Sequence, residues 1–338
     1  MGQDRTLARG ARVFGSLLLA ALALISLVWI ARDFTKADEV VDVWWNWAGL
    51  PARAEDGVWV TSFLEPTLVL LYTVAAVTAY RSSSSGAILA CVGSLTAVLR
   101  VPGLWNLGSD WMQGVPDGLL SKVLFSTIAT VVLGLVLVVT AVVGRRPAQG
   151  PSTGYGYGFP AQDTAEGSPA GPTRGGAVTA FLLLGAGGAL LVAWEIRAVQ
   201  QVGWDRYEHL LTGERSIVRL LDSPAGWVQW SVVVLSLTAG VAALAGAPFS
   251  RPLGLITAAP LLALGLFAVA FGVKTEAFGH FGDLGIEAQL RLLTSLYELV
   301  AGAAVLLALA RGEQRASRAL PRYRGGGSAA YGTSPQTW

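Results

Sequence analysis

The chain has few of the residues on which most cofactor and metal sites depend. Among its 338 residues are one cysteine, two histidines and only three lysines. A single cysteine, Cys91, excludes a disulfide within one chain. The histidines, His209 and His280, lie in loops between apolar segments, so neither can hold a haem inside a membrane. With Glu208 and Asp283 nearby they match no established metal-ligand spacing, and we therefore expect no cofactor and no metal.

Charged residues are also scarce, whereas apolar residues are abundant. Only 14% of the residues are charged and 53% are hydrophobic, and the mean hydropathy is +0.54. A soluble domain of this length does not need so much apolar surface. Eight runs are each long enough to cross about 30 Å of hydrocarbon. They cover residues 13–31, 58–80, 86–105, 119–144, 177–196, 227–246, 253–272 and 290–310. The predicted fold is all-α, a multi-pass membrane protein with eight transmembrane helices.

The eight runs fall into two related halves. Residues 10–32 resemble residues 175–197, and Trp29 in the first segment aligns with Trp194 in the second. Self-similarity at one long period indicates a duplicated unit, here of four helices. The expected domains are a first four-helix repeat over 1–145, a disordered linker over 146–174, a second repeat over 175–312 and a disordered basic tail over 313–338.

Basic residues gather on one side of the predicted membrane. If both termini, the linker and the short turns at Arg81 and Arg251 face the cytoplasm, 13 of the 24 basic and four of the 22 acidic residues lie there. That face then has a net charge of +9, and the rest of the chain has −7. The positive-inside rule predicts cytoplasmic termini in the plasma membrane. Four spans return the chain to its starting side, so the two repeats are expected to be parallel.

The loops predict contacts with the lipid bilayer. In the second outer loop, apolar residues at a helical spacing predict an amphipathic helix on the outer surface. These residues are Leu210, Leu211, Ile217, Val218, Leu220 and Leu221. Trp44, Trp45 and Trp47, in the first outer loop, suit the aromatic belt of a membrane interface. The linker and tail are expected to be a tether and a basic segment near anionic lipid, and a cytoplasmic protein partner of the tail is the alternative.

Three ionisable residues are predicted to lie at membrane depth. Glu65 and Glu298 lie roughly 10 to 12 Å below the outer ends of their spans, and Arg100 reaches a similar level from the other side. An unpaired charge there costs about 3 kcal/mol or more, so each group needs a partner in protein or water. Glu65 and Arg100 lie on the two spans of one hairpin, and we expect them to pair. With Tyr297, which precedes Glu298, these residues form the candidate polar cavity, and a purely structural ion pair is the alternative.

Three functions remain open. The first is a non-enzymatic membrane protein that binds a small ligand, a lipid or an envelope partner in an outward-facing polar cavity between the repeats. The alternative is a carrier or channel for a small solute or proton, although no charged residue lies in the inner half of any predicted span. A membrane enzyme that acts on a lipid-linked substrate comes third, because no catalytic motif is present. Nothing indicates a nucleic-acid partner. The excess of Arg over Lys resembles proteins of GC-rich bacterial genomes, such as those of actinobacteria.

Overall fold

Helices make up almost all of the described structure. A computed structural model of the chain describes residues 5–147, except 56, 83 and 113, and residues 172–318, except 215–218. The helices are α1 (Arg9–Lys36), α2 (Val40–Trp47), α3 (Leu64–Arg81), α4 (Ser85–Asn106), α5 (Asp117–Val143), α6 (Arg174–Val202), α7 (Trp204–Thr212), α8 (Ala225–Leu244), α9 (Ser250–Lys274) and α10 (Ile286–Arg318). Two short strands, β1 (Arg5–Leu7) and β2 (Arg145–Pro147), pair antiparallel and join the start of α1 to the end of α5.

Seven helices of the described chain are long and apolar enough to cross a membrane: α1, α4, α5, α6, α8, α9 and α10. The prediction of an all-helical membrane protein is confirmed to this extent. Helix α3 occupies the place of the remaining expected span, but it has 18 residues and carries Glu65 and Arg81 near its two ends. That α3 is an eighth span stays a prediction. Large apolar side chains lie exposed along the helices, for example Leu70 at 69%, Phe125 at 75% and Val300 at 65%, as expected where the surroundings are apolar.

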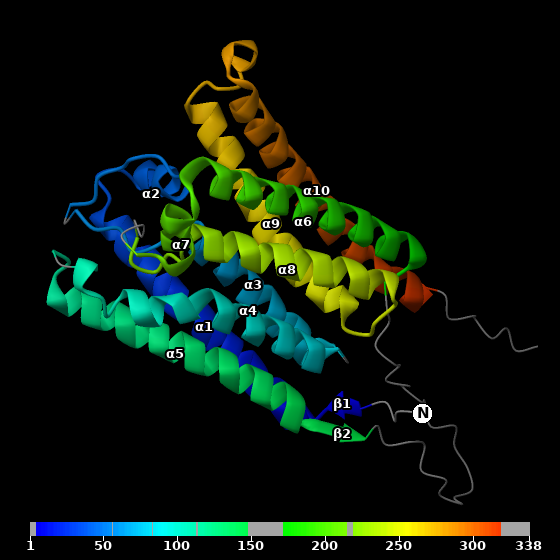
Figure 1. Cartoon of the computed structure of the whole chain (residues 1–338). Coiled ribbons are helices and arrows are strands. Elements are labelled where there is room, and N and C mark those ends of the chain that lie inside the picture. The colour runs from blue at the N-terminus through cyan, green and yellow to red at the C-terminus, as the bar shows by residue number, and fades with distance from the viewer. Residues whose placement is uncertain are drawn as a thin grey trace, which may run out of the picture.

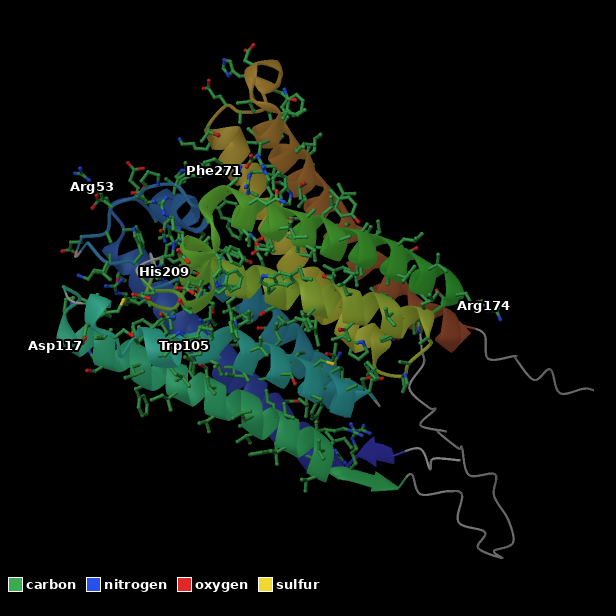
Figure 2. All side chains as sticks on the ribbon, viewed as in Figure 1. Arg53, Trp105, Asp117, Arg174, His209 and Phe271 are labelled. Atoms are coloured by element: carbon green, nitrogen blue, oxygen red, sulfur yellow. The ribbon has the colours of Figure 1, made fainter. Side chains whose placement is uncertain are left out.

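The helices form an elongated bundle. The most extensive contacts join α1 to α3, α4 to α5, α6 to α8, and α9 to α10. Figure 1 shows α2 and α7 at one end of the bundle, which we call the α2 end, and the two strands and the start of α6 at the other, which we call the strand end. In Figure 2, Arg53, Asp117 and His209 lie at the α2 end, whereas Arg174 lies at the strand end.

Glycines allow the closest helix contacts. A Cβ atom on Gly93 of α4 would lie 2.5 Å from the carbonyl oxygen of Gly134 in α5. A Cβ atom on Gly265 of α9 would lie 2.3 Å from the backbone nitrogen of Leu299 in α10. At both crossings the backbones therefore approach directly, which is how helices commonly associate within membranes.

The two halves of the chain share their cores. The core of the first half includes Val228 and Ile256 from the second, and the core of the second half packs against Cys91 from the first. A third cluster combines Trp47 of α2 with Phe267 of α9, whose ring centroids lie 6.3 Å apart. Trp47 is buried and thus packs within the protein, although the sequence favours a place in the interfacial belt.

The second outer loop differs from its prediction. Helix α7 ends at Thr212, residues 215–218 lie outside the described part of the chain, and Leu220 and Leu221 are buried in a non-helical segment. The N–H groups of Leu220 and Leu221 donate to the carbonyls of Trp59 and Val60, at 3.2 and 2.9 Å. These leucines therefore join the two halves and do not form a helix on the surface.

The predicted linker and tail fall mostly beyond the described residues. The linker is described only up to residue 147 and from residue 172. There the Thr173 hydroxyl accepts a hydrogen bond from the Gly176 N–H and caps α6. Helix α10 continues to Arg318, beyond residue 313, where the sequence predicts that the tail begins.

Candidate functional site

The carboxylate of Asp33, in the last turn of α1, organises the segment that leads into α3. Asp33 is fully buried and accepts hydrogen bonds from the N–H groups of Val60 and Thr61, at 3.2 and 2.6 Å, and from the Thr61 hydroxyl, at 2.6 Å. With these N–H groups bound to a side chain, residues 58–63 stay non-helical, and α3 begins at Leu64 and not at residue 58 as predicted. Sequence reasoning missed Asp33 because it placed this residue outside the first span.

Glu65 and Arg100 form the ion pair that the sequence predicts. Arg100 Nη1 lies 2.8 Å from Glu65 Oε1, and the side chains are 4% and 0% exposed. The other Glu65 oxygen accepts a hydrogen bond from the Ser62 N–H at 2.5 Å. Arg100 also donates to the carbonyl of Leu221, at 2.9 Å. Both charges are therefore compensated by protein groups, and one of those groups comes from the second half.

The loop before α8 completes this polar region. Arg219 Nε donates to Asn46 Oδ1 at 3.0 Å, and Arg219 Nη1 lies 3.3 Å from Asp222 Oδ2. Burial raises the pKa of Asp222, and the positive charge of Arg219 opposes that change. We call the whole group the interface polar cluster; its members are Asp33, Asn46, Thr61, Ser62, Glu65, Arg100, Arg219 and Asp222.

Pro102 creates a second connection between the halves. A proline inside α4 has no N–H to offer the carbonyl of Val98, four residues earlier. Trp227 Nε1 donates to that carbonyl at 2.8 Å, and the Ser223 hydroxyl donates to the carbonyl of Leu99. The backbone acceptor freed by the proline is thus satisfied by the second half, as membrane-embedded helices require.

A cavity of about 640 Å³ lies beside the end of α2, among α6, α8, α9 and α10. Its walls are mainly apolar and include Leu191, Leu264, Phe271 and Leu292. Smaller cavities of about 460 and 380 Å³ lie between α4 and α8 and between α3 and α9. The 640 Å³ cavity contacts both halves, through residues 48 and 49 of the first half and four helices of the second, and we call it the α2-side cavity.

Glu298 is the acid of the α2-side cavity. It is 7% exposed and lines the cavity, and no described residue forms a hydrogen bond or ion pair with its carboxylate. Gln229 lines the same cavity, and its Oε1 atom is buried without a hydrogen-bond donor. Tyr297 instead donates from its hydroxyl to the carbonyl of Leu183 in α6, at 2.7 Å. The four predicted site residues therefore do not share one cavity: Glu65 and Arg100 form a closed pair, Glu298 faces the α2-side cavity, and Tyr297 points to α6.

Charged and aromatic groups meet on one wall of this cavity. The guanidinium of Arg291 lies 4.3 Å from the centroid of the Trp194 ring and 3.1 Å from Glu287. Trp194 Nε1 donates to the Thr294 hydroxyl at 3.1 Å. Arg291, Thr294 and Glu298 follow one face of α10, because they are spaced by three and four residues.

A further buried acid, Glu195, was also missed by sequence reasoning. It is 4% exposed and accepts a hydrogen bond from the Tyr207 hydroxyl, which itself accepts one from Trp230 Nε1 at 2.6 Å. Burial, followed by the hydrogen bond to Glu195, raises the pKa of Tyr207 to about 12. Glu195 lies inside the predicted span 177–196, so an acid near the end of an apolar run was the available signal.

Neither a metal-ligand cluster in the described structure nor a similar known protein identifies the site. In the part of the chain that the structure describes, no three His, Cys, Asp or Glu side chains lie close enough together to hold a metal ion. His209 Nδ1 lies 3.2 Å from Glu214 Oε2, and His280 Nδ1 lies 3.2 Å from the carbonyl of Glu276. Comparison with known proteins found no matching family, no matching curated protein and no matching solved structure.

Proposed function

We propose that this chain is a non-enzymatic protein of the plasma membrane that binds a small amphiphilic ligand in the α2-side cavity, from the outer side. One observation carries the proposal: Glu298 is a buried acid on the wall of a cavity of about 640 Å³ and has no partner among the described residues. Ionisable residues at membrane depth are costly and mark functional sites by default. Ligand pockets commonly measure about 300 to 1,000 Å³, with apolar walls and few polar groups.

The first half supports α3 as an eighth span. Strand β1 precedes α1 and strand β2 follows α5, and the two strands are hydrogen-bonded to each other. The first half therefore begins and ends at the same side, which requires an even number of crossings. Helices α1, α4 and α5 supply three, and α3, with 18 residues or about 27 Å, supplies the fourth.

The proposed repeat is supported by a similar hydrogen bond in each half. In the first, Trp29 Nε1 of α1 donates to the Ser126 hydroxyl of α5, at 3.0 Å. In the second, Trp194 Nε1 of α6 donates to the Thr294 hydroxyl of α10, at 3.1 Å. The same tryptophan position thus ties the first helix of each half to its last helix. The pairing of first with second and of third with fourth helices is also the same in both halves.

The proposed orientation follows from charge, with both termini and the strand end in the cytoplasm and the α2 end outside. In a Cys91→Ser background, a cysteine at Arg53 or His209 should react with an impermeant thiol reagent in intact cells. A cysteine at Arg174, which lies at the strand end (Figure 2), should react only after permeabilisation. Labelling of position 174 from outside would reverse the orientation and place the cavity on the cytoplasmic side.

Blocking the α2-side cavity tests the function itself. Ala268 of α9 lines the cavity, so Ala268→Trp should fill it. Leu266→Trp adds the same ring on the same helix at a side chain that is 39% exposed, and serves as the matched control. A thermal-shift panel of solutes and lipids should yield ligands that stabilise the wild type and Leu266→Trp but not Ala268→Trp. Equal stabilisation of all three proteins would place ligand binding elsewhere. Uptake of such a ligand into proteoliposomes would indicate that the protein is a carrier.

A further inference from the structure

We infer that the ligand of the α2-side cavity is an amphiphilic organic cation whose ammonium group pairs with Glu298; this inference rests on the function proposed above. The starting point is the balance of charge around the cavity. Glu298 and Arg291 are the two charged residues that line it in the described structure. They lie seven residues apart on α10, about 10 Å along the helix axis.

Arg291 is already compensated. Its guanidinium lies 3.1 Å from Glu287 and stacks over the ring of Trp194. Glu287 also accepts a hydrogen bond from Gln201, at 2.5 Å. Glu298 has no such neighbours, and an acid in an apolar setting is stabilised as a carboxylate only if a cation is supplied. Within the described chain nothing supplies it, so the ligand is the available source.

The hydrogen-bonding groups of the cavity support the same conclusion. The hydroxyls of Thr294 and Ser295 donate to carbonyls of their own helix, those of Leu290 and Arg291, at 2.8 and 2.9 Å. Thr294 and Ser295 are thus not free to donate to a ligand. Both the Glu298 carboxylate and Gln229 Oε1 are acceptors, and Gln229 Oε1 is buried without a donor. A ligand that brings N–H donors and a positive charge satisfies these acceptors, whereas an anionic ligand is repelled by the carboxylate of Glu298.

The other residues that line the cavity indicate the chemistry of the ligand's apolar part. Leu191, Leu264, Phe271 and Leu292 offer an apolar surface with one aromatic ring. A hydrocarbon or aryl group packs there, and an aromatic ring close to a cation adds further attraction. The chemical class is therefore an apolar molecule with one ammonium group. A flat polar cation or a sugar does not match these walls.

Three probes of one shape and different charge test this inference: phenylbutylamine, phenylbutanol and phenylbutyrate. Their affinities are measured by calorimetry on the full-length protein in nanodiscs at neutral pH. The amine should bind at least about tenfold more tightly than the alcohol, as expected when a buried charge gains its partner. The butyrate should bind weakest. This comparison uses the wild type alone, so it stands even if a variant fails to fold.

Two variants locate the effect. Glu298→Gln should lower the affinity for the amine to that of the alcohol and leave alcohol binding within about twofold. Glu55→Gln removes the same charge at an exposed ion pair with Lys36 and should leave the preference for the amine intact. If the amine and the alcohol bind the wild type equally and both fail to bind Ala268→Trp, the inference of a cationic ligand is wrong and the proposed function still holds. Binding of none of the probes, or binding indifferent to Ala268→Trp, would overturn both.

Discussion

Three buried acids of this chain have very different surroundings. Asp33 accepts hydrogen bonds from two backbone N–H groups and a hydroxyl, and Glu65 has Arg100 and Ser62. Glu298, by contrast, faces a cavity without a partner among the described residues. A residue's neighbours and not its type thus separate a structural acid from a candidate binding group.

The Glu65–Arg100 pair gives a prediction for a double-mutant cycle. Glu65→Gln leaves a guanidinium that cannot lose its charge and that keeps its hydrogen bond to the carbonyl of Leu221. Arg100→Gln leaves an acid that can become neutral by taking up a proton. We expect Glu65→Gln to lower the free energy of unfolding by about 3 kcal/mol, and Arg100→Gln to lower it less. The double variant should recover on the order of 1 kcal/mol, measured by denaturant unfolding in detergent. Strictly additive losses would show that the two side chains do not interact.

Tyr207 gives a prediction for pH. Its pKa is raised from 10.0 to about 12 by burial and by the hydrogen bond to Glu195. Because the folded state holds the phenolic proton more tightly, the stabilisation is complete below pH 10 and is lost as the pH rises toward 12. We expect Tyr207→Phe to be less stable than the wild type at pH 8 by about 1 kcal/mol. The difference should shrink between pH 10 and 12 in thermal melts. A difference that does not change with pH would mean that Tyr207 ionises alike in both states.

Helix crossings give a prediction at the scale of elements. In Gly265→Ala, the new Cβ would lie 2.3 Å from the backbone nitrogen of Leu299, so α9 and α10 must separate. Overpacking of this kind costs about 1 to 3 kcal/mol, which should appear as a lower unfolding midpoint. Gly185→Ala is the control, because its Cβ meets nothing within 4 Å. It should be neutral or stabilising by up to about 1 kcal/mol through helix propensity. Equal effects of the two changes would argue against the close α9–α10 contact.

The sequence predicts the elements better than it predicts what joins them. Apolar runs locate the long helices because every span needs a continuous apolar stretch. The sequence places the start of α3 too early because residues 58–63 contain no charge and no proline to end the apolar run, whereas Asp33 binds the N–H groups of Val60 and Thr61. Leu220 and Leu221 were assigned to a surface helix because their spacing also fits one. Their true partners, Trp59 and Val60, lie about 160 residues earlier in the chain, and no local pattern indicates such a contact.

The site was predicted in part for the same reason. The Glu65–Arg100 pair joins adjacent spans of one hairpin, so connectivity alone brings these residues together. Glu298 was identified from depth, but its separation from that pair depends on how the two halves pack. Asp33 and Glu195 lie near span ends, where an acid does not stand out from the loop beside it.

At the scale of the whole molecule, the halves should assemble without a covalent link. Fragments 1–150 and 172–338, produced together, are expected to co-purify, because the interface polar cluster and the Pro102 contacts join them. Arg219→Gln should reduce recovery of the partner fragment, since Arg219 binds Asn46 across the interface. Arg206→Gln, at an exposed position of α7, is the control and should not. Well-inserted fragments that fail to associate would make the linker an essential part of the fold.

The donors to the carbonyls of Val98 and Leu99 belong to the second half, so a growing chain makes them late. A nascent chain delivers α4 to the bilayer before residues 219–227 have left the ribosome. Until they arrive, the Val98 carbonyl, which Pro102 leaves without an N–H donor, and part of the Arg100 guanidinium lack the partners that the second half provides. A chain truncated before residue 219 therefore keeps an unpaired backbone acceptor and a partly unpaired guanidinium in its first half, and only the finished polypeptide supplies their partners.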